Sequence, residues 1–189
     1  MRRLFPLVVL PLLAACGKPP PTTTVHEFYN ANLDRYFRTA NAEEAAALKS
    51  NPGSGEVATN NTFLAYPATK YPENAKPVCR FYGSMSPGPN SHFYTADAGE
   101  CEALKKLAQT TPAAEKRWNF EEIAFAINVP AGGNCPSDTL PVYRAYNGGF
   151  ERGKDSNHRL TTDPAIYKDM LAKGWKGENV VMCSPRTAG

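Results

Sequence analysis

Three segments of this chain repeat the same order of short sequence patterns, and this recurrence constrains the fold more than any other feature. Each segment opens with a β-prone run that ends in Asn or Gly: Val25–Asn30, Val78–Gly83 and Val142–Asn147. A second β-prone run follows each of them: Arg35–Thr39, Ser91–Thr95 and Asn157–Thr161. Two such runs separated by turn-forming residues predict a β-hairpin in each segment.

A short helix is expected after each hairpin. Asn41, Asp97 and Asp163 stand at its start, where a side-chain oxygen can accept hydrogen bonds from the free amides of the first turn. Glu44 and Glu100 lie three residues after their caps, which predicts capping boxes. The residues four and seven positions after each cap are mostly apolar, so each helix has one face to bury.

A closing strand completes each segment, at Thr62–Tyr66, Trp118–Ile127 and Gly174–Cys183. We therefore expect an α+β fold of three tandem β-β-α-β units, packed as one compact pseudo-repeat domain over residues 25–185. The units would cover about residues 25–67, 78–130 and 142–184. Because one unit cannot bury its own apolar face, the three are expected to share a common centre.

The N-terminus has the layout of an export signal. Arg2 and Arg3 precede an apolar run, Leu4–Leu13, which is too short to cross a hydrocarbon core of about 30 Å. Leu13-Ala14-Ala15-Cys16 resembles a bacterial lipobox, in which cleavage precedes the cysteine and lipid is attached to it. This resemblance implies a signal peptide over 1–15, lipidation of Cys16 and a Pro/Thr spacer over 16–24. An ordinary secretory signal that happens to contain a cysteine is the alternative.

A lipidated Cys16 would place the protein in the cell envelope. Acyl chains such as palmitate contribute about 0.8 kcal/mol per buried methylene, so several of them hold a protein durably on a bilayer. Gly17 rather than Asp follows the cysteine, which in a Gram-negative lipoprotein favours the outer membrane. The expected partner at this end is therefore the membrane, and the expected location is the periplasmic or surface face of the outer membrane.

Four cysteines remain once Cys16 is assigned to lipid: Cys79, Cys101, Cys135 and Cys183. In an exported protein they should form two disulfides, for which three pairings are possible. Their positions in the expected units favour Cys79–Cys101 and Cys135–Cys183. No C-x2-C pair is present, so a structural zinc site is not expected.

The formal charge is +3, and removal of Arg2 and Arg3 with the signal would lower it further. This charge is too small to indicate a nucleic-acid partner. The chain has no H-E-x-x-H or H-x3-H spacing, so neither a catalytic metal nor another cofactor is expected.

The same residues resemble a bacterial repeat family named domain of unknown function 5648. Its units run V-Y-R-F-Y-N, then H-F-Y-T, a helix, and G-W with E-G-x-A-F. Val78–Phe125 and Val142–Met182 match this order, and Val25–Tyr66 is a weaker copy. In that copy Glu27 replaces the strand Arg, Tyr36 stands where the family has His, and the Trp is absent. The resemblance implies an exported accessory module that binds cell-wall or other glycans, and it carries over no catalytic residue.

Two histidines occupy equivalent positions in the second and third segments. His92 follows Ser91 and His158 follows Asn157, but adjacent residues of a strand point to opposite faces, which disfavours a Ser-His triad. No G-x-S-x-G elbow is present either. We therefore predict no catalytic residue and expect each imidazole to hold a turn by hydrogen bonds.

Strand arginines and tyrosines are the candidate ligand-binding residues. Arg80 and Arg144 would be half-buried and need a carboxylate, which Glu121, Glu122 or Glu178 could supply, and Glu27 could be a charge-reversed member of the same layer. The alternative is a small polar pocket where guanidinium groups and rings bind a ligand. The candidates for that pocket are Arg80, Tyr82, His92, Tyr94, Arg144, Tyr146 and His158.

These patterns predict an exported lipoprotein that acts as a non-catalytic binding or scaffolding module at the envelope, with glycan or peptidoglycan as partner. Its aromatic rings could stack on sugars or form the core. An envelope hydrolase is one alternative, which requires a cleft with a nucleophile and base or with two carboxylates about 5–10 Å apart. A purely structural envelope protein is the other.

Overall fold

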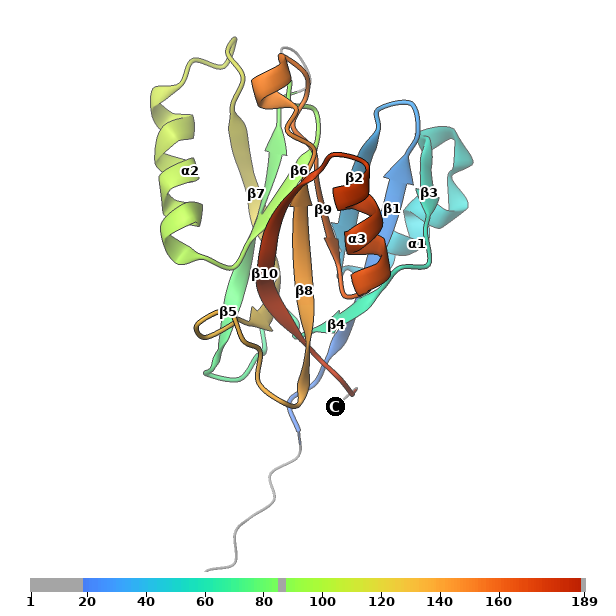
Figure 1. The fold of residues 1–189 in the computed structure, drawn as a ribbon, viewed down its shortest axis with the longest axis vertical. Coiled ribbons are helices and arrows are strands. Elements are labelled where there is room, and N and C mark those ends of the chain that lie inside the picture. The colour runs from blue at the N-terminus through green and yellow to red at the C-terminus, as the bar shows by residue number, and fades with distance from the viewer. Residues whose placement is uncertain (1–18, 85–87, 188–189) are drawn as a thin grey trace, which may run out of the picture.

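The computed structural model describes residues 19–84 and 88–187 (Figure 1). The expected signal peptide over 1–15, the lipidation site Cys16 and Gly17 lie outside these residues. Within the described part of the chain, no helix is long and apolar enough to span a membrane.

Four strands form a smaller sheet around β1. The strand order is β2-β1-β3, and β4 pairs with the first residues of β1, from Thr23 to Val25. All of these pairings are antiparallel, and the β1–β2 pair is the first hairpin expected from the sequence. The bounds are β1 Thr23–Asn30, β2 Arg35–Thr39, β3 Glu56–Ala58 and β4 Phe63–Ala65.

Six strands form the larger sheet, in the order β6-β5-β7-β10-β8-β9, and this sheet curls into a half-barrel (Figure 1). The pairs β5–β6 and β8–β9 are the second and third expected hairpins. The central strands β7 and β10 pair through Asn128 and Cys183, which joins the two halves of the sheet. The bounds are β5 Ala75–Gly83, β6 His92–Thr95, β7 Trp118–Asn128, β8 Thr139–Tyr146, β9 His158–Thr161 and β10 Lys176–Pro185.

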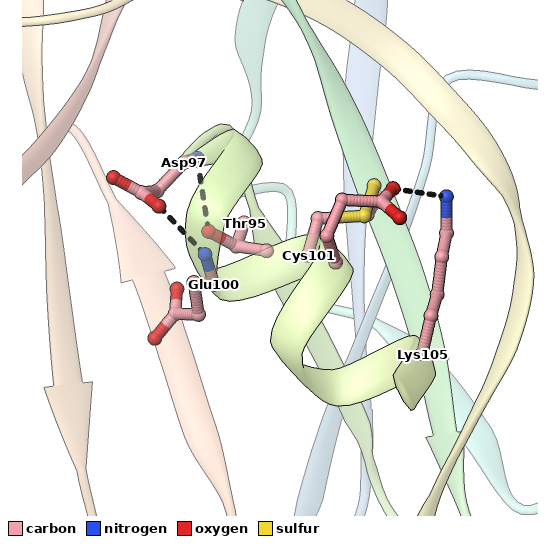
Figure 2. The surroundings of a disulfide bond; sticks show 7 residues. Thr95, Asp97, Glu100, Cys101 and Lys105 are labelled. Atoms are coloured by element: carbon pink, nitrogen blue, oxygen red, sulfur yellow. Dashed lines mark hydrogen bonds and ion pairs between the residues drawn. A yellow bond between two sulfur atoms is a disulfide. The ribbon is translucent and has the colours of Figure 1, made fainter. Parts of the chain in front are cut away.

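Each hairpin leads into a helix that begins at the expected cap. The side chains of Asn41, Asp97 and Asp163 accept hydrogen bonds from first-turn amides. Each cap amide in turn donates to the hydroxyl of the threonine two residues earlier, as Figure 2 shows for Asp97 and Thr95. The helices are α1 Ala42–Ser50, α2 Ala98–Thr110 and α3 Pro164–Ala172, with short 3-10 turns η1 Pro52–Ser54 and η2 Phe150–Arg152.

The prediction of an α+β fold of three tandem β-β-α-β units is wrong. The protein is mostly β-sheet, and its second and third segments merge into the single six-stranded sheet. The reason lies in the closing strands. β7 and β10 have 11 and 10 residues and meet each other, whereas β4 has three residues and pairs with the start of β1. Toward the larger sheet, the end of the first segment adds an isolated bridge from Tyr66 to Ala126 and a hydrogen-bonded contact of Leu64 with Ser184, rather than a paired strand.

One hydrophobic core joins the two sheets. Val25 of β1 and Phe63 of β4 pack in the same cluster as Phe125 of β7 and Val142 of β8. Val25, Phe125 and Val142 are fully buried. The two sheets therefore form one folded body. Separating them would expose the apolar side chains of this cluster to water and remove their hydrophobic stabilisation.

Both expected disulfide pairs are present. Cys79 of β5 bonds Cys101 on the inward face of α2 (Figure 2), with sulfur atoms 1.99 Å apart. Cys135, in the loop before β8, bonds Cys183 of β10, with sulfur atoms 1.94 Å apart. The first bond attaches the longest helix to the sheet, and the second fastens the loop at the junction of β7 and β10.

Removing either disulfide should destabilise the fold according to the loop that it closes. The cysteines of the two bonds are 22 and 48 residues apart, so chain entropy predicts losses of about 3 and about 4 kcal/mol. Urea unfolding of Cys79→Ala/Cys101→Ala and Cys135→Ala/Cys183→Ala, compared with the parent, measures these losses. A thiol titration that finds no free sulfhydryl outside Cys16 controls for reshuffling. Losses below about 1 kcal/mol in both variants would contradict the assignment.

Candidate functional site

The strand arginines lie in internal ion-pair clusters that connect different elements. Arg80 of β5 contacts three carboxylates: Glu121 at 2.8 Å and Glu122 at 3.2 Å, both on β7, and Glu44 of α1 at 3.1 Å. Glu121 has a lowered pKa because, although burial opposes its ionisation, hydrogen bonds and charge from His92 and Arg80 favour it. This cluster therefore ties α1 to the larger sheet.

Arg144 of β8 repeats this arrangement in the third segment. Its guanidinium contacts Glu178 of β10 at 2.8 Å and Glu100 of α2 at 3.3 Å, and it donates to the carbonyl oxygen of Tyr94. The predicted ion pairs with Glu121, Glu122 and Glu178 are thus confirmed.

Glu44 and Glu100 also bind the strand arginines, which the sequence did not lead us to expect. Each lies in the first turn of its helix, three residues after the cap. Their backbone amides do donate hydrogen bonds to the cap side chains, but their carboxylates bind Arg80 and Arg144 rather than closing capping boxes. Their shared spacing after the helix caps was the available signal.

A third cluster surrounds the buried carboxylate of Glu27. Arg38 of β2 lies 2.6 Å from it and Arg159 of β9 lies 2.8 Å from it, while Thr59 donates a hydrogen bond at 2.7 Å. Burial opposes ionisation of Glu27, but the two guanidinium groups outweigh burial and hold its pKa below the usual range. Arg159 belongs to the larger sheet, so this cluster joins the two sheets.

His92 and His158 lie in stacks of aromatic side chains. His92 is 5.0 Å from the ring of Tyr82, and His158 stacks on Tyr146 at 4.7 Å with an angle of 16°. Among the described residues, neither Nδ1 atom has a hydrogen-bond partner. The hydroxyl of Ser91 donates to the carbonyl oxygen of Ser156 rather than to an imidazole.

The remaining candidate tyrosines make internal hydrogen bonds. Tyr94 is buried and donates to the carbonyl oxygen of Arg38 at 2.6 Å. Tyr82 donates to Asn90 and Tyr146 donates to Glu151. The described residues form three main cavities, and of the seven ligand-binding candidates only Arg144 lines one of them.

The largest of these cavities, about 540 Å³, lies at the N-terminal end of α2. Its walls are mostly apolar and include Val129, Val180 and Val181. Arg144 also reaches it, but Glu100 and Glu178 already neutralise that guanidinium.

A polar cavity of about 260 Å³ lies where the three hairpin loops meet. Hydrogen bonds join the loops in pairs: Arg35 donates to Asn90 at 2.8 Å, and Asn157 donates to the carbonyl oxygen of Asp34 at 2.6 Å. The Ser91–Ser156 bond joins the remaining pair. The loops are therefore fixed relative to one another.

A second, more apolar groove of about 170 Å³ adjoins the polar cavity, and we call it the loop-end groove. The two share Pro89, Lys154 and Ser156. The groove lies between the C-terminal half of α2 and η2, at the same end of the molecule (Figure 1). Its lining residues are Pro89, Leu107, Lys116, Arg117, Trp118, Phe150, Lys154 and Ser156.

Phe150 is the most exposed large apolar side chain in the described residues, at 71%, and Leu107 in the same groove is 53% exposed. The turn that carries Phe150 is anchored, because its amide donates to the Tyr146 hydroxyl at 2.9 Å and the Lys154 amide donates to the carbonyl of Gly149. Only glycine fits at 149, since a Cβ there would lie 2.0 Å from the carbonyl oxygen of Asp155. The aromatic ring is therefore held in solvent by a rigid turn.

Sequence reasoning missed this groove. The available signal was Gly148-Gly149-Phe150, an aromatic residue directly after two turn glycines and outside the expected strands. Within the described residues, no group of three His, Cys, Asp or Glu side chains is placed to hold a metal ion.

The buried imidazole of His158 should make the protein sensitive to mild acid. Burial, together with the charge of Arg144, lowers its pKa to about 3, and Glu178 at 3.8 Å is beyond hydrogen-bond distance and already bound by Arg144. Between pH 6.5 and 3, His158 is therefore protonated in the unfolded chain but stays neutral in the native state. Stability should fall by about 1.4 kcal/mol per pH unit from this group.

Urea unfolding of the parent and of His158→Phe at pH 7 and pH 5 tests this expectation. Phenylalanine keeps an aromatic ring but cannot titrate, so the variant should gain about 2 kcal/mol relative to the parent between the two pH values. Parallel pH dependence in both proteins would contradict the buried, neutral state of His158.

Comparison with known proteins supplies the family. No curated protein and no solved structure matches the chain. The sequence model of one family, described as a domain of unknown function (DUF5648), matches it twice, over residues 14–110 and 68–185. The two matches together span most of the chain and confirm the resemblance seen in its motifs. The chain belongs to the DUF5648 family.

Proposed function

We propose that this protein is an exported, lipid-anchored envelope protein that binds a cell-wall or other glycan, without catalysis, at the loop-end groove. The observation that carries the proposal is the exposed ring of Phe150 on its anchored turn. An apolar ring held rigidly in water favours a partner that covers it, and a preformed site loses little conformational entropy on binding.

The groove has the features that a sugar ring requires. Trp118 packs on Phe93 at 5.6 Å and also lines the groove, so two aromatic side chains are available to the apolar face of a pyranose. The adjoining polar cavity is lined by asparagine, serine, aspartate and basic side chains, which are the groups that bind sugar hydroxyls. This combination of flat apolar surface and adjacent polar groups favours a glycan over a purely apolar ligand.

The arrangement of the histidines and of the groove supports the non-catalytic part of the proposal. Ser91 is bonded to a backbone carbonyl, and the lowered pKa of His158 reflects burial rather than a paired nucleophile. The groove lining contains no carboxylate, whereas a glycosidase needs two beside the bond that it cleaves. The adjoining polar cavity has two, but Asp34 accepts a hydrogen bond from the Tyr29 hydroxyl and Asp155 lies against Gly88. A purely structural protein has no need for an anchored, exposed Phe150.

The position of the groove suits an anchored protein. β1 begins at Thr23 and ends at Asn30 beside the hairpin loops, so the spacer leaves the fold at the end opposite η2 (Figure 1). If the Leu13–Cys16 lipobox is processed as proposed, the groove faces away from the membrane. A cell-wall polymer is accessible from that position.

Phe150→Ala should weaken binding to purified peptidoglycan sacculi by about tenfold or more, because truncating a central aromatic contact costs about 1.4 kcal/mol or more. Co-sedimentation of the full-length protein in a non-ionic detergent measures this loss. Tyr71→Ala is the matched control, since Tyr71 is exposed but precedes β5 at the opposite end of that strand from Gly83. Equal losses in both variants, or no binding by the parent to sacculi or to a glycan array, would refute the proposal.

Replacement of Cys16 should release the protein from the membrane. The parent is expected to incorporate a palmitate analogue and to fractionate with membranes, and Cys16→Ala should do neither. In-gel detection of the analogue and membrane flotation provide the measurements. Lys18→Ala, which leaves the lipobox intact, is the control, and unchanged labelling of Cys16→Ala would exclude a lipid at that position.

A further inference from the structure

The loop-end groove is positively charged as well as aromatic. Lys116, Arg117 and Lys154 line it, and no Asp or Glu does. The formal charge of the whole chain is only +3, so three uncompensated cations in one small groove stand out from the average surface.

None of the three cations is neutralised where it lies. Lys116 and Lys154 are exposed, and among the described residues no carboxylate is within ion-pair distance of either. Arg117 hydrogen-bonds to neutral oxygens: the side chain of Asn119 at 2.8 Å and the backbone carbonyls of Thr111 and Ala108. This differs from Arg80 and Arg144, each of which binds at least two carboxylates.

The nearby carboxylates are directed elsewhere. Glu151 is held by Lys176 at 2.5 Å and by the Tyr146 hydroxyl, contacts that lower its pKa to about 2. The Asp155 side chain lies against Gly88 and lines the polar cavity rather than the groove. The charge of the groove is thus open to a ligand.

We propose that the ligand of this groove is an acidic glycan, in which the sugar face packs on Phe150 and Trp118 while carboxylates on the sugar meet Lys116, Arg117 and Lys154. This inference rests on the proposed glycan-binding function. Exposed charge pairs contribute little individually, but three cations around one aromatic platform select among ligands that stack equally well. Charge on the glycan, rather than its ring type alone, would then determine recognition.

Peptide-free glycan strands from peptidoglycan are the probe, because every muramic acid residue in them carries a carboxylate. The comparison probe is the same strands after carbodiimide activation and borohydride reduction, which converts the carboxylates to alcohols. Full-length protein in non-ionic detergent should bind the reduced strands about tenfold more weakly. Its binding to the native strands should also fall with added salt, because exposed charges are screened beyond about 10 Å at 0.1 M ionic strength.

Charge-removing variants locate the effect. Lys116→Gln and Lys154→Gln should each weaken binding to native strands about two- to fivefold, with a smaller change for reduced strands. Lys70→Gln is the control, since Lys70 is exposed beside Tyr71 and outside the groove. Circular dichroism and urea unfolding confirm that each variant is folded.

The outcomes distinguish failure of the acidic-glycan inference from failure of the proposed glycan-binding function. If native and reduced strands bind equally, or if Lys116→Gln and Lys154→Gln match Lys70→Gln, the acidic-glycan inference is overturned while glycan binding through Phe150 stands. If neither probe binds and no glycan or sacculus does, both proposals fail. Tighter binding of an oligothymidine than of native strands would overturn the inference in favour of a nucleic acid.

Discussion

The buried carboxylate of Glu27 is the constraint on which the joined structure depends. It accepts hydrogen bonds from Arg38 within its own sheet and from Arg159 of the other sheet. Arg38 also donates to the backbone carbonyl of Leu160, so the two sheets share charge and hydrogen bonds across one buried interface. Buried charges are costly unless paired, and loss of one partner leaves the others uncompensated at a cost of several kcal/mol. The interface therefore favours the observed arrangement over any that would leave the Glu27 carboxylate unpaired.

That arrangement brings the three hairpin loops to one end of the molecule. Arg35, Asn90 and Asn157 bond the loops to one another, which fixes the position of the turn that carries Phe150. The turn itself is held by its own hydrogen bonds, and the contacts between the loops fix where it lies relative to the rest of the site. The strand arginines Arg80 and Arg144 are paired with carboxylates, whereas the cations that line the groove have no carboxylate partner. This contrast distinguishes a structural charge from one available for binding.

Local patterns in the sequence predicted local structure well. The hairpins, the caps at Asn41, Asp97 and Asp163, the ion pairs of the strand arginines and both disulfides are present. Hydrogen-bonding preferences of caps and turns act over a few residues, so a single segment reveals them. The prediction of three equal units failed because similar segments need not pack alike. The length of each closing strand decided which edges could pair.

The candidate site also combines features that the sequence indicates with features that only the tertiary structure decides. The sequence by itself indicated the family, the cysteine pairs and the charged layer, all of which are confirmed. The export signal and the lipid anchor remain proposals. The sequence did not place Phe150 beside Trp118, because those residues are distant in the chain and meet only when η2 approaches α2 and β7. Tertiary structure alone decided which aromatic rings are core and which are exposed, and which cations are neutralised. Burial and pairing are properties of the assembled surface, and a residue's own neighbours in sequence do not specify them.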